Sequence, residues 1–142
     1  MKVLVAIDGS PASTRALKYA IRFAKGGGRP AIVLANVQNV VTLGLGEAAA
    51  MMPADWQEKV AANLSRRQLR RAIAICKQAK IPFESIAESG AVGETIVRIA
   101  RRKKAEHIVM GTRGLGGVRG LLLGSTTTAV VHLATVPVTL IK

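Results

Sequence analysis

The fold is decided by the stretch KVLVAIDGSPASTRALKYAIRFAKGGG, residues 2–28. Its first aliphatic run, residues 3–7, predicts a short strand that is buried on both faces. Asp8 and Gly9 interrupt this run, Ser10 is a good helix cap, and Pro11 suits the first position of a helix. Apolar residues then recur at helical spacing until three glycines, residues 26–28, end the helix.

The same alternation of strand and helix continues along the chain. Further strands are predicted at residues 31–37, 83–87, 107–110 and 136–141, and further helices at about residues 54–80 and 93–103 and after Ser125, which is predicted to cap the last helix. The side chains predicted to point inward from the long and the last helix are Trp56, Val60, Leu64, Ala72, Ile73, Cys76, Ala129, Val130 and Leu133. This order predicts a single α/β domain, residues 1–142, with helices on both faces of a parallel sheet and right-handed crossovers.

The charge balance is strongly basic, with 21 Lys and Arg residues, 8 Asp and Glu residues, and a formal net charge of +13. Such a surface favours anionic partners, which include nucleotides, nucleic acids and acidic membranes. Aromatic residues make up 3% of the chain, which argues against base stacking as the main mode of binding. Hydrophobic residues make up 49%, which excludes an intrinsically disordered chain.

Neither a membrane span nor a disulfide framework is expected. No apolar run reaches the roughly 18 residues that cross a bilayer, and Asp8 follows the first apolar run too early for a signal peptide. One cysteine, Cys76, excludes an internal disulfide and a cysteine-cluster metal site, and its place on an apolar stripe predicts an inert core thiol. Together these features predict a cytoplasmic protein.

Two segments are suited to ligand binding at the carboxyl edge of the predicted sheet, where doubly wound folds place their ligands. One is Asp8-Gly9-Ser10, and the other runs from Met110-Gly111-Thr112-Arg113-Gly114 to Gly124-Ser125-Thr126. The glycines let backbone amides approach a ligand, and the start of the last helix suits a phosphate. An ordinary glycine-rich loop before a capped helix would show the same pattern. The chain has neither a Walker A loop nor the glycine fingerprint of dinucleotide-binding enzymes.

The spacing Gly111-x2-Gly114-x9-Gly124-Ser125 resembles the ATP-binding pattern of the universal stress protein family. Three more segments resemble that family in matching order, namely residues 3–10, 90–96 and 134–138. The resemblance implies a three-layer sandwich of the adenine nucleotide alpha hydrolase type, with a five-stranded parallel sheet of order 3-2-1-4-5. Strands one and four would then be neighbours, so both candidate segments would meet at one edge.

The resemblance also implies a set of binding residues. Gly111, Gly114, Gly124, Ser125 and Thr126 would hold the phosphates and ribose of ATP or another adenine nucleotide. The adenine and ribose side would be lined by Ala6, Asp8, Val37 and Met110. Asp8 could hold a magnesium ion through water, and the last strand, Val136 to Ile141, would pair two copies of the chain in a homodimer. The charge of +13 is unusual for the family and suggests a further anionic partner.

Several residues have a second interpretation. Asp8 could simply close the turn after the first strand. Arg66, Arg67, Arg70 and Arg71 could bind nucleic acid, although a basic run more often marks a solvated helix face. The long connection at residues 38–53 contains Met51 and Met52, which could cover a nucleotide or belong to an ordinary loop. His107 and His132 lack the neighbours that a metal site needs.

The sequence therefore favours an ATP-binding stress protein that acts as a nucleotide-dependent switch or sensor. Two alternatives are a module that binds nucleic acid or another anionic partner through its basic helix, and a weak ATPase. Catalysis has little support, because the chain shows no Ser-His-Asp pattern and no paired carboxylates near the glycine-rich segment.

Overall fold

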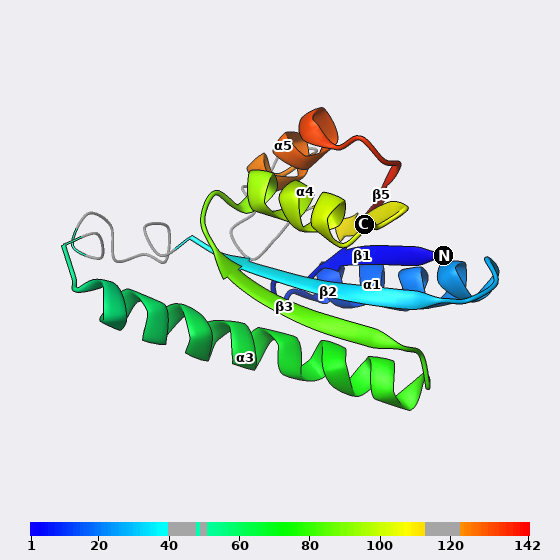
Figure 1. The fold of residues 1–142 in the computed structure, drawn as a ribbon, viewed down its shortest axis with the longest axis horizontal. Helices are drawn as coiled ribbons and strands as arrows, with labels where there is room; N and C mark the ends of the chain where they lie inside the picture. The colour runs from blue at the N-terminus through cyan, green and yellow to red at the C-terminus, as the bar shows by residue number, and fades with distance from the viewer. Residues whose placement is uncertain (40–47, 49–50, 113–122) are drawn as a thin grey trace.

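The structure is a computed structural model that describes residues 1–39, 48, 51–112 and 123–142 of the chain. Helices and strands alternate along these residues (Figure 1). Their bounds are β1 Lys2–Ala6, α1 Pro11–Lys25, β2 Ala31–Gln38, α3 Ala54–Gln78, β3 Phe83–Ser89, α4 Val92–Arg102, β4 His107–Gly111, α5 Ser125–Leu133 and β5 Val138–Ile141. Each predicted strand and helix is present, and most of their boundaries shift by one or two residues.

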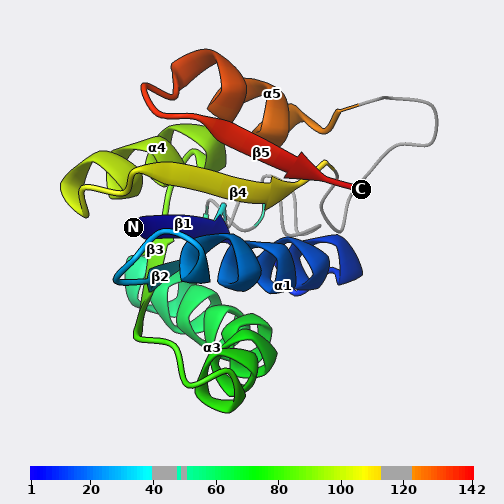
Figure 2. The ribbon, with the colours of Figure 1, turned by 90° about the vertical axis from the view of Figure 1, so that its right-hand side faces the viewer.

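The five strands form one parallel sheet of order β3-β2-β1-β4-β5, which confirms the predicted topology. Helices α1 and α3 pack on one face of the sheet, and α4 and α5 pack on the other (Figure 2). The aliphatic side chains of the central strands alternate between these two layers: Val3 and Val5 face α1 and α3, whereas Leu4 faces α4 and α5. The three-layer α/β sandwich is therefore confirmed.

Local signals explain both ends of α1. The Ser10 hydroxyl accepts a hydrogen bond from the Ser13 amide at 3.0 Å, which satisfies one of the donors that a helix start leaves open. Pro11 is the first helical residue, and Gly26 caps the carboxyl end. These three positions confirm the prediction for the segment that follows β1.

The buried stripe predicted for α3 is wrong in its first half. Trp56, Val60 and Leu64 are half-buried, and the buried positions there are Ala61 and Ser65. Figure 1 shows the physical reason: the amino-terminal turns of α3 extend past the carboxyl ends of β2 and β3, so no sheet lies beneath them. The second half of the predicted stripe, at Ala72 and Cys76, is buried against the sheet.

The last helix and strand also differ from their predictions. Leu133, predicted to point inward, is 44% exposed, because it belongs to the last turn of α5. Strand β5 begins at Val138 rather than Val136, since Pro137 has no amide hydrogen to donate to a sheet. The Pro137 carbonyl still accepts a hydrogen bond from the Ile108 amide at 2.9 Å.

Helices α4 and α5 approach each other most closely at Gly93. A Cβ atom added at this glycine would lie 2.6 Å from the Cβ atom of Ala129 and 3.4 Å from the Thr126 carbonyl oxygen. Both Gly93 and Thr127, one residue beyond Thr126, are buried. The glycine therefore sets how near the start of α5 lies to α4.

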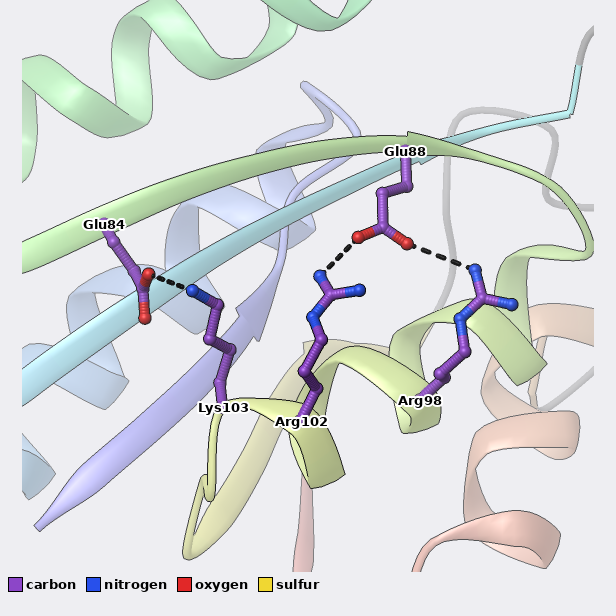
Figure 3. Close-up of polar contacts among 5 residues, drawn as sticks. All are labelled: Glu84, Glu88, Arg98, Arg102 and Lys103. Carbon is purple, nitrogen blue, oxygen red and sulfur yellow. Dashed lines mark hydrogen bonds and ion pairs between the residues drawn. The ribbon is translucent and has the colours of Figure 1, made fainter.

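Ion pairs connect α4 to the exposed side of β3 (Figure 3). The Glu88 carboxylate accepts hydrogen bonds from Arg102 and, at 3.1 Å, from Arg98, while Lys103 contacts Glu84 at 2.6 Å. The hydrogen bond from Arg102 holds the pKa of Glu88 below its usual value, so this carboxylate is ionised at neutral pH. Three basic residues of this surface, Arg98, Arg102 and Lys103, thus share two acidic partners.

No helix within residues 1–39, 51–112 and 123–142 is both long and apolar enough to span a membrane.

Candidate functional site

The carboxyl edge of the sheet brings together three of the side chains predicted to line an adenine ring. Val5 pairs with Val109, so the residues that follow them, Ala6 and Met110, lie beside each other at this edge. Both side chains contact the apolar layer beneath α4 and α5, and Val37 near the end of β2 contacts the same layer. Met110 is 4% exposed, whereas Ala6 and Val37 are half-buried. This edge can present a small apolar surface to a flat ring.

The start of α5 is held against the end of β4 by hydrogen bonds. The Gly124 amide donates to the Thr112 carbonyl at 3.0 Å. The Thr127 hydroxyl donates to the carbonyls of Gly111 at 3.2 Å and Thr112 at 3.3 Å. As a result, Gly111 and Gly124 are adjacent although thirteen positions separate them in the sequence. Of the predicted phosphate-binding residues, Gly111 and Gly124 therefore lie at the same end of the sheet as Ala6 and Met110.

The amino terminus of α5 has no side-chain cap. Its cap position is Gly124, in an extended conformation, and the Gly124 carbonyl accepts from the Thr128 amide at 3.0 Å. The prediction that Ser125 caps this helix is wrong, because Ser125 is already the first helical residue and is exposed. A helix start without a cap has backbone N–H groups available for an anion and carries partial positive charge.

Some of the predicted site lies outside the described residues. Arg113 and Gly114 belong to this group, as does most of the long connection after β2. Met51 and Met52 are described, and their side chains are 86% and 40% exposed.

Asp8 lies on the side of the sheet that α1 and α3 cover, whereas Ala6 contacts the layer of α4 and α5. One of its carboxylate oxygens, Oδ1, accepts a hydrogen bond from the Ser10 amide at 2.9 Å, which closes the turn between β1 and α1. The side chain also lines a cavity of about 400 Å³ between α1 and α3. Asp8 thus has both the turn-closing role and a place at a cavity, on the α1 and α3 side of the sheet.

The polar lining of this cavity comes from the end of β1 and from the two helices. Its polar residues and glycine are Asp8, Gly9, Ser13, Thr14, Arg67, Gln68 and Arg71. Gly9 has a φ of +82°, and a Cβ atom there would lie 3.0 Å from Cγ of Gln68, so a glycine suits this close approach of α3. The four arginines of α3 therefore do not act as one group, because Arg67 and Arg71 line the cavity and Arg66 instead donates to Asn63 at 3.2 Å.

A buried amide network, which the sequence analysis did not detect, supports the floor of this region. The Asn36 side chain is fully buried and donates to the Ile7 carbonyl at 2.6 Å and to Oε1 of Gln68 at 2.7 Å. Gln38 donates to Oδ1 of Asn36 at 2.8 Å and to the same Gln68 oxygen at 2.7 Å. The available signal was an asparagine at a position of β2 that alternation assigns to the core. The network ties β2, α3 and the end of β1 together.

Two further side chains with reactive groups, Cys76 and His107, pack within the fold. Burial raises the pKa of Cys76 to about 11, which agrees with the predicted inert core thiol. Burial lowers the pKa of His107, whose Nε2 lies 2.7 Å from the Thr139 hydroxyl and whose ring packs edge-on against Phe23. Among the residues that the structure describes, no cluster of three His, Cys, Asp or Glu side chains could bind a metal ion.

Comparison with known proteins identifies the relatives of this chain. A sequence model of the universal stress protein family matches residues 1–142. The chain is 34% identical over 140 residues to a universal stress protein encoded in the QAH/OAS sulfhydrylase 3′ region of Thermus aquaticus, covering 99% of this chain and 97% of the relative.

Two solved structures of similar fold contain adenine nucleotides. The first is a universal stress protein in complex with cAMP, which is 25% identical to this chain and superposes with a TM-score of 0.70. The alignment covers 100% of this chain and 96% of the chain in that structure. A universal stress protein family member from Arabidopsis thaliana with AMP bound has a TM-score of 0.66 and 20% identity, with coverage of 100% and 90%. At 20% identity, the similarity to the second structure supports the shared fold.

Proposed function

Because the chain belongs to the universal stress protein family, we propose that it binds an adenine nucleotide, with ATP as the preferred form, and acts as a nucleotide-dependent switch. The adenine lies against Ala6, Val37 and Met110, and the phosphates lie at the amino terminus of α5. Occupation of this site changes the surface around α5, and a partner in the stress response reads that change.

The observation that supports this proposal best is the uncapped start of α5. Gly124 has no side chain with which to cap the helix, and although α3 and α4 also lack a side-chain cap, α5 is the helix whose open start lies at the end of β4. The hydrogen bond from the Gly124 amide to the Thr112 carbonyl keeps these open donors at the end of β4, near Met110. Backbone donors at a helix start bind phosphate without any cationic side chain.

In this proposal, a magnesium ion would bind mainly to the phosphates of the nucleotide. Mg²⁺ is usually bound through one or two carboxylates together with substrate phosphates and several waters. Asp8 is the acid nearest in sequence to the proposed site, and one of its oxygens already accepts from the Ser10 amide. Its carboxylate would therefore contact the ion through water, while the phosphates supply the direct ligands. When bound, the ion neutralises part of the phosphate charge.

The test uses Gly124→Asp, because aspartate at this position caps α5 within the chain and brings a negative charge to the phosphate position. The extended backbone of Gly124, with φ −73° and ψ 161°, accepts aspartate without strain. We expect the variant to be as stable as the parent, or more stable by about 1 kcal/mol. We expect its affinity for Mg·ATP, measured by titration calorimetry, to fall at least about tenfold.

Gly124→Ala is the matched control, since it adds neither a cap nor a charge. It should keep an affinity closer to that of the parent than Gly124→Asp does. The proposal is wrong if the parent releases no heat and shows no thermal shift with ATP or cAMP at millimolar concentration. It is also wrong if Gly124→Asp binds ATP as tightly as the alanine variant.

We further propose that two copies of the chain associate through β5. This strand is at the edge of the sheet and pairs with β4 on one side, and all four of its residues are half-buried. Val131 and Leu133 on α5 are also 46% and 44% exposed, which adds apolar side chains to the surface of the molecule. Sedimentation velocity at micromolar concentration should give the mass of a dimer. A monomer at every accessible concentration would contradict this assembly.

A further inference from the structure

The cavity between α1 and α3 has the size and the charge of a second ligand site. Its volume of about 400 Å³ is within the usual range for small-molecule pockets, which is about 300–1,000 Å³. It belongs to the layer of α1 and α3, whereas Ala6, Val37 and Met110 contact the layer of α4 and α5. The cavity is therefore on the other face of the sheet from the proposed adenine surface.

Arg67 and Arg71 provide the cationic wall of this cavity. They are four residues apart on α3, which places their side chains next to each other along one side of the helix. Within the described part of the chain, neither guanidinium forms an ion pair. Two arginines of α4 differ, because Arg98 and Arg102 both form ion pairs with Glu88 (Figure 3). Two adjacent guanidinium groups with no acid partner match the oxygens of a phosphate group.

The opposite wall can accept a hydrogen bond from the ligand. Asp8 lines the cavity and is oriented by the hydrogen bond that its Oδ1 accepts from the Ser10 amide. Thr14, whose hydroxyl donates to the Ser10 carbonyl at 3.2 Å, lines the cavity beside it. A carboxylate repels phosphate but binds hydroxyl groups. The cavity thus has one end for an anion and one end for a hydrogen-bond donor.

A hydrogen-bond network holds Gln68, which forms the floor of the cavity between these two ends. Gln68 lies between the arginines on α3, and its Oε1 accepts from both Asn36 and Gln38. Gly9 brings the end of β1 close to this glutamine. Because Asn36 is fully buried and its hydrogen bonds join β2 to the segment after β1 and to α3, the core sets the spacing between Asp8 and the backbone of α3, from which the exposed side chains of Arg67 and Arg71 extend.

From this arrangement we propose that the cavity binds a phosphorylated sugar, with its phosphate between Arg67 and Arg71 and a hydroxyl group on Asp8. Such a ligand satisfies the two cations and the single carboxylate at once. The cavity does not include the adenine surface, but it shares Asp8 with the proposed nucleotide site, and the same phosphate-and-hydroxyl chemistry is present in the ribose phosphate part of a nucleotide. The experiment therefore separates a free sugar phosphate from a nucleotide that reaches into the cavity.

The probe is ribose 5-phosphate, added to the ¹⁵N-labelled full chain at constant ionic strength and followed by amide chemical shifts. We expect saturable shifts at Gly9, Thr14 and Gln68, and none with ribose. The double variant R67Q/R71Q should weaken the binding of ribose 5-phosphate at least about tenfold, because charge-assisted hydrogen bonds are lost. R66Q/R70Q removes the same charge from neighbouring positions that do not line the cavity, and it should change the affinity by less than about twofold.

Three results would overturn this site. They are the absence of saturable shifts with ribose 5-phosphate, equal losses of affinity in R66Q/R70Q and R67Q/R71Q, and a loss of Mg·ATP affinity in R67Q/R71Q without any binding of ribose 5-phosphate to the parent. The third result would show that the arginines serve the nucleotide. If R67Q/R71Q keeps its affinity for Mg·ATP and loses that for ribose 5-phosphate, the two sites are separate. Failure of Gly124→Asp to affect ATP binding leaves this test unchanged, because Gly124 does not line the cavity.

Discussion

Replacing Gly93 by alanine is expected to lower the free energy of unfolding by about 1–3 kcal/mol, the usual cost of adding a methyl group to a packed interior. The new Cβ atom would lie 2.6 Å from Cβ of Ala129, well inside the distance of about 3.5–4.0 Å at which two carbon atoms attract each other. Alanine normally stabilises a helix relative to glycine by up to about 1 kcal/mol. That gain is reduced here because Gly93 is the second residue of α4, so the clash prevails.

Urea denaturation followed by circular dichroism measures this effect, and Ala129→Gly provides the matched partner. Ala129→Gly alone should cost about 1 kcal/mol through helix propensity. The double variant G93A/A129G removes one of the two clashing methyl groups, so it should be more stable than the sum of the single effects predicts. A Gly93→Ala protein as stable as the parent, or additive single effects, would contradict the close packing of α4 and α5.

The clash also links the core to the proposed nucleotide site. The added methyl would lie 2.6 Å from Cβ of Ala129, so α4 and α5 must move apart near the first turns of α5, where the Thr126 carbonyl lies 3.4 Å from the same methyl. The backbone donors proposed to bind phosphate belong to this same turn.

Replacing the buried Asn36 by leucine is expected to cost about 2–3 kcal/mol in the free energy of unfolding, because buried polar groups lose their partners. Leucine is close to asparagine in size, so the cavity term is small. The amides of Gln38 and Gln68 and the Ile7 carbonyl would each lose a hydrogen bond inside the protein. Loss of the network should also weaken the binding of ribose 5-phosphate, since Gln68 forms the floor of the cavity.

The control for this prediction is the triple variant N36L/Q38L/Q68L. It removes the amides that the single variant leaves without partners, and replacing all members of a polar group by apolar ones is often nearly neutral. We therefore expect the triple variant to be more stable than Asn36→Leu in urea denaturation. If the triple variant is less stable by the sum of three independent losses, the network does not act as a unit.

The elements of this fold were predictable because their signals are local. Aliphatic runs marked β1, β2 and β4, and the cap at Ser10 and the glycine at residue 26 marked the two ends of α1. Sheet order came from family resemblance, since hydrophobic periodicity carries no information about which strands are neighbours. The observed order 3-2-1-4-5 places the ends of β1 and β4 together, as the resemblance implied.

The candidate site was predictable to a smaller extent. Glycines and hydroxyl residues near α5 were visible as a pattern, but the cap position was assigned to Ser125 and belongs to Gly124. A one-residue difference in the start of a helix decides whether its donors are capped or open. That difference depends on backbone angles, which composition and spacing do not specify.

Periodicity and chain-local chemistry thus settled the α/β class, the sequence of elements and the residues that begin and end α1. Tertiary packing decided which side chains meet: Arg67 and Arg71 line a cavity while Arg66 does not, and Asn36 is buried as a hydrogen-bonded link between two strands and a helix. The reason is geometric. Neighbouring residues on a helix point about 100° apart, so their roles depend on how the helix is rotated and placed against the sheet, and contacts between distant segments determine that placement.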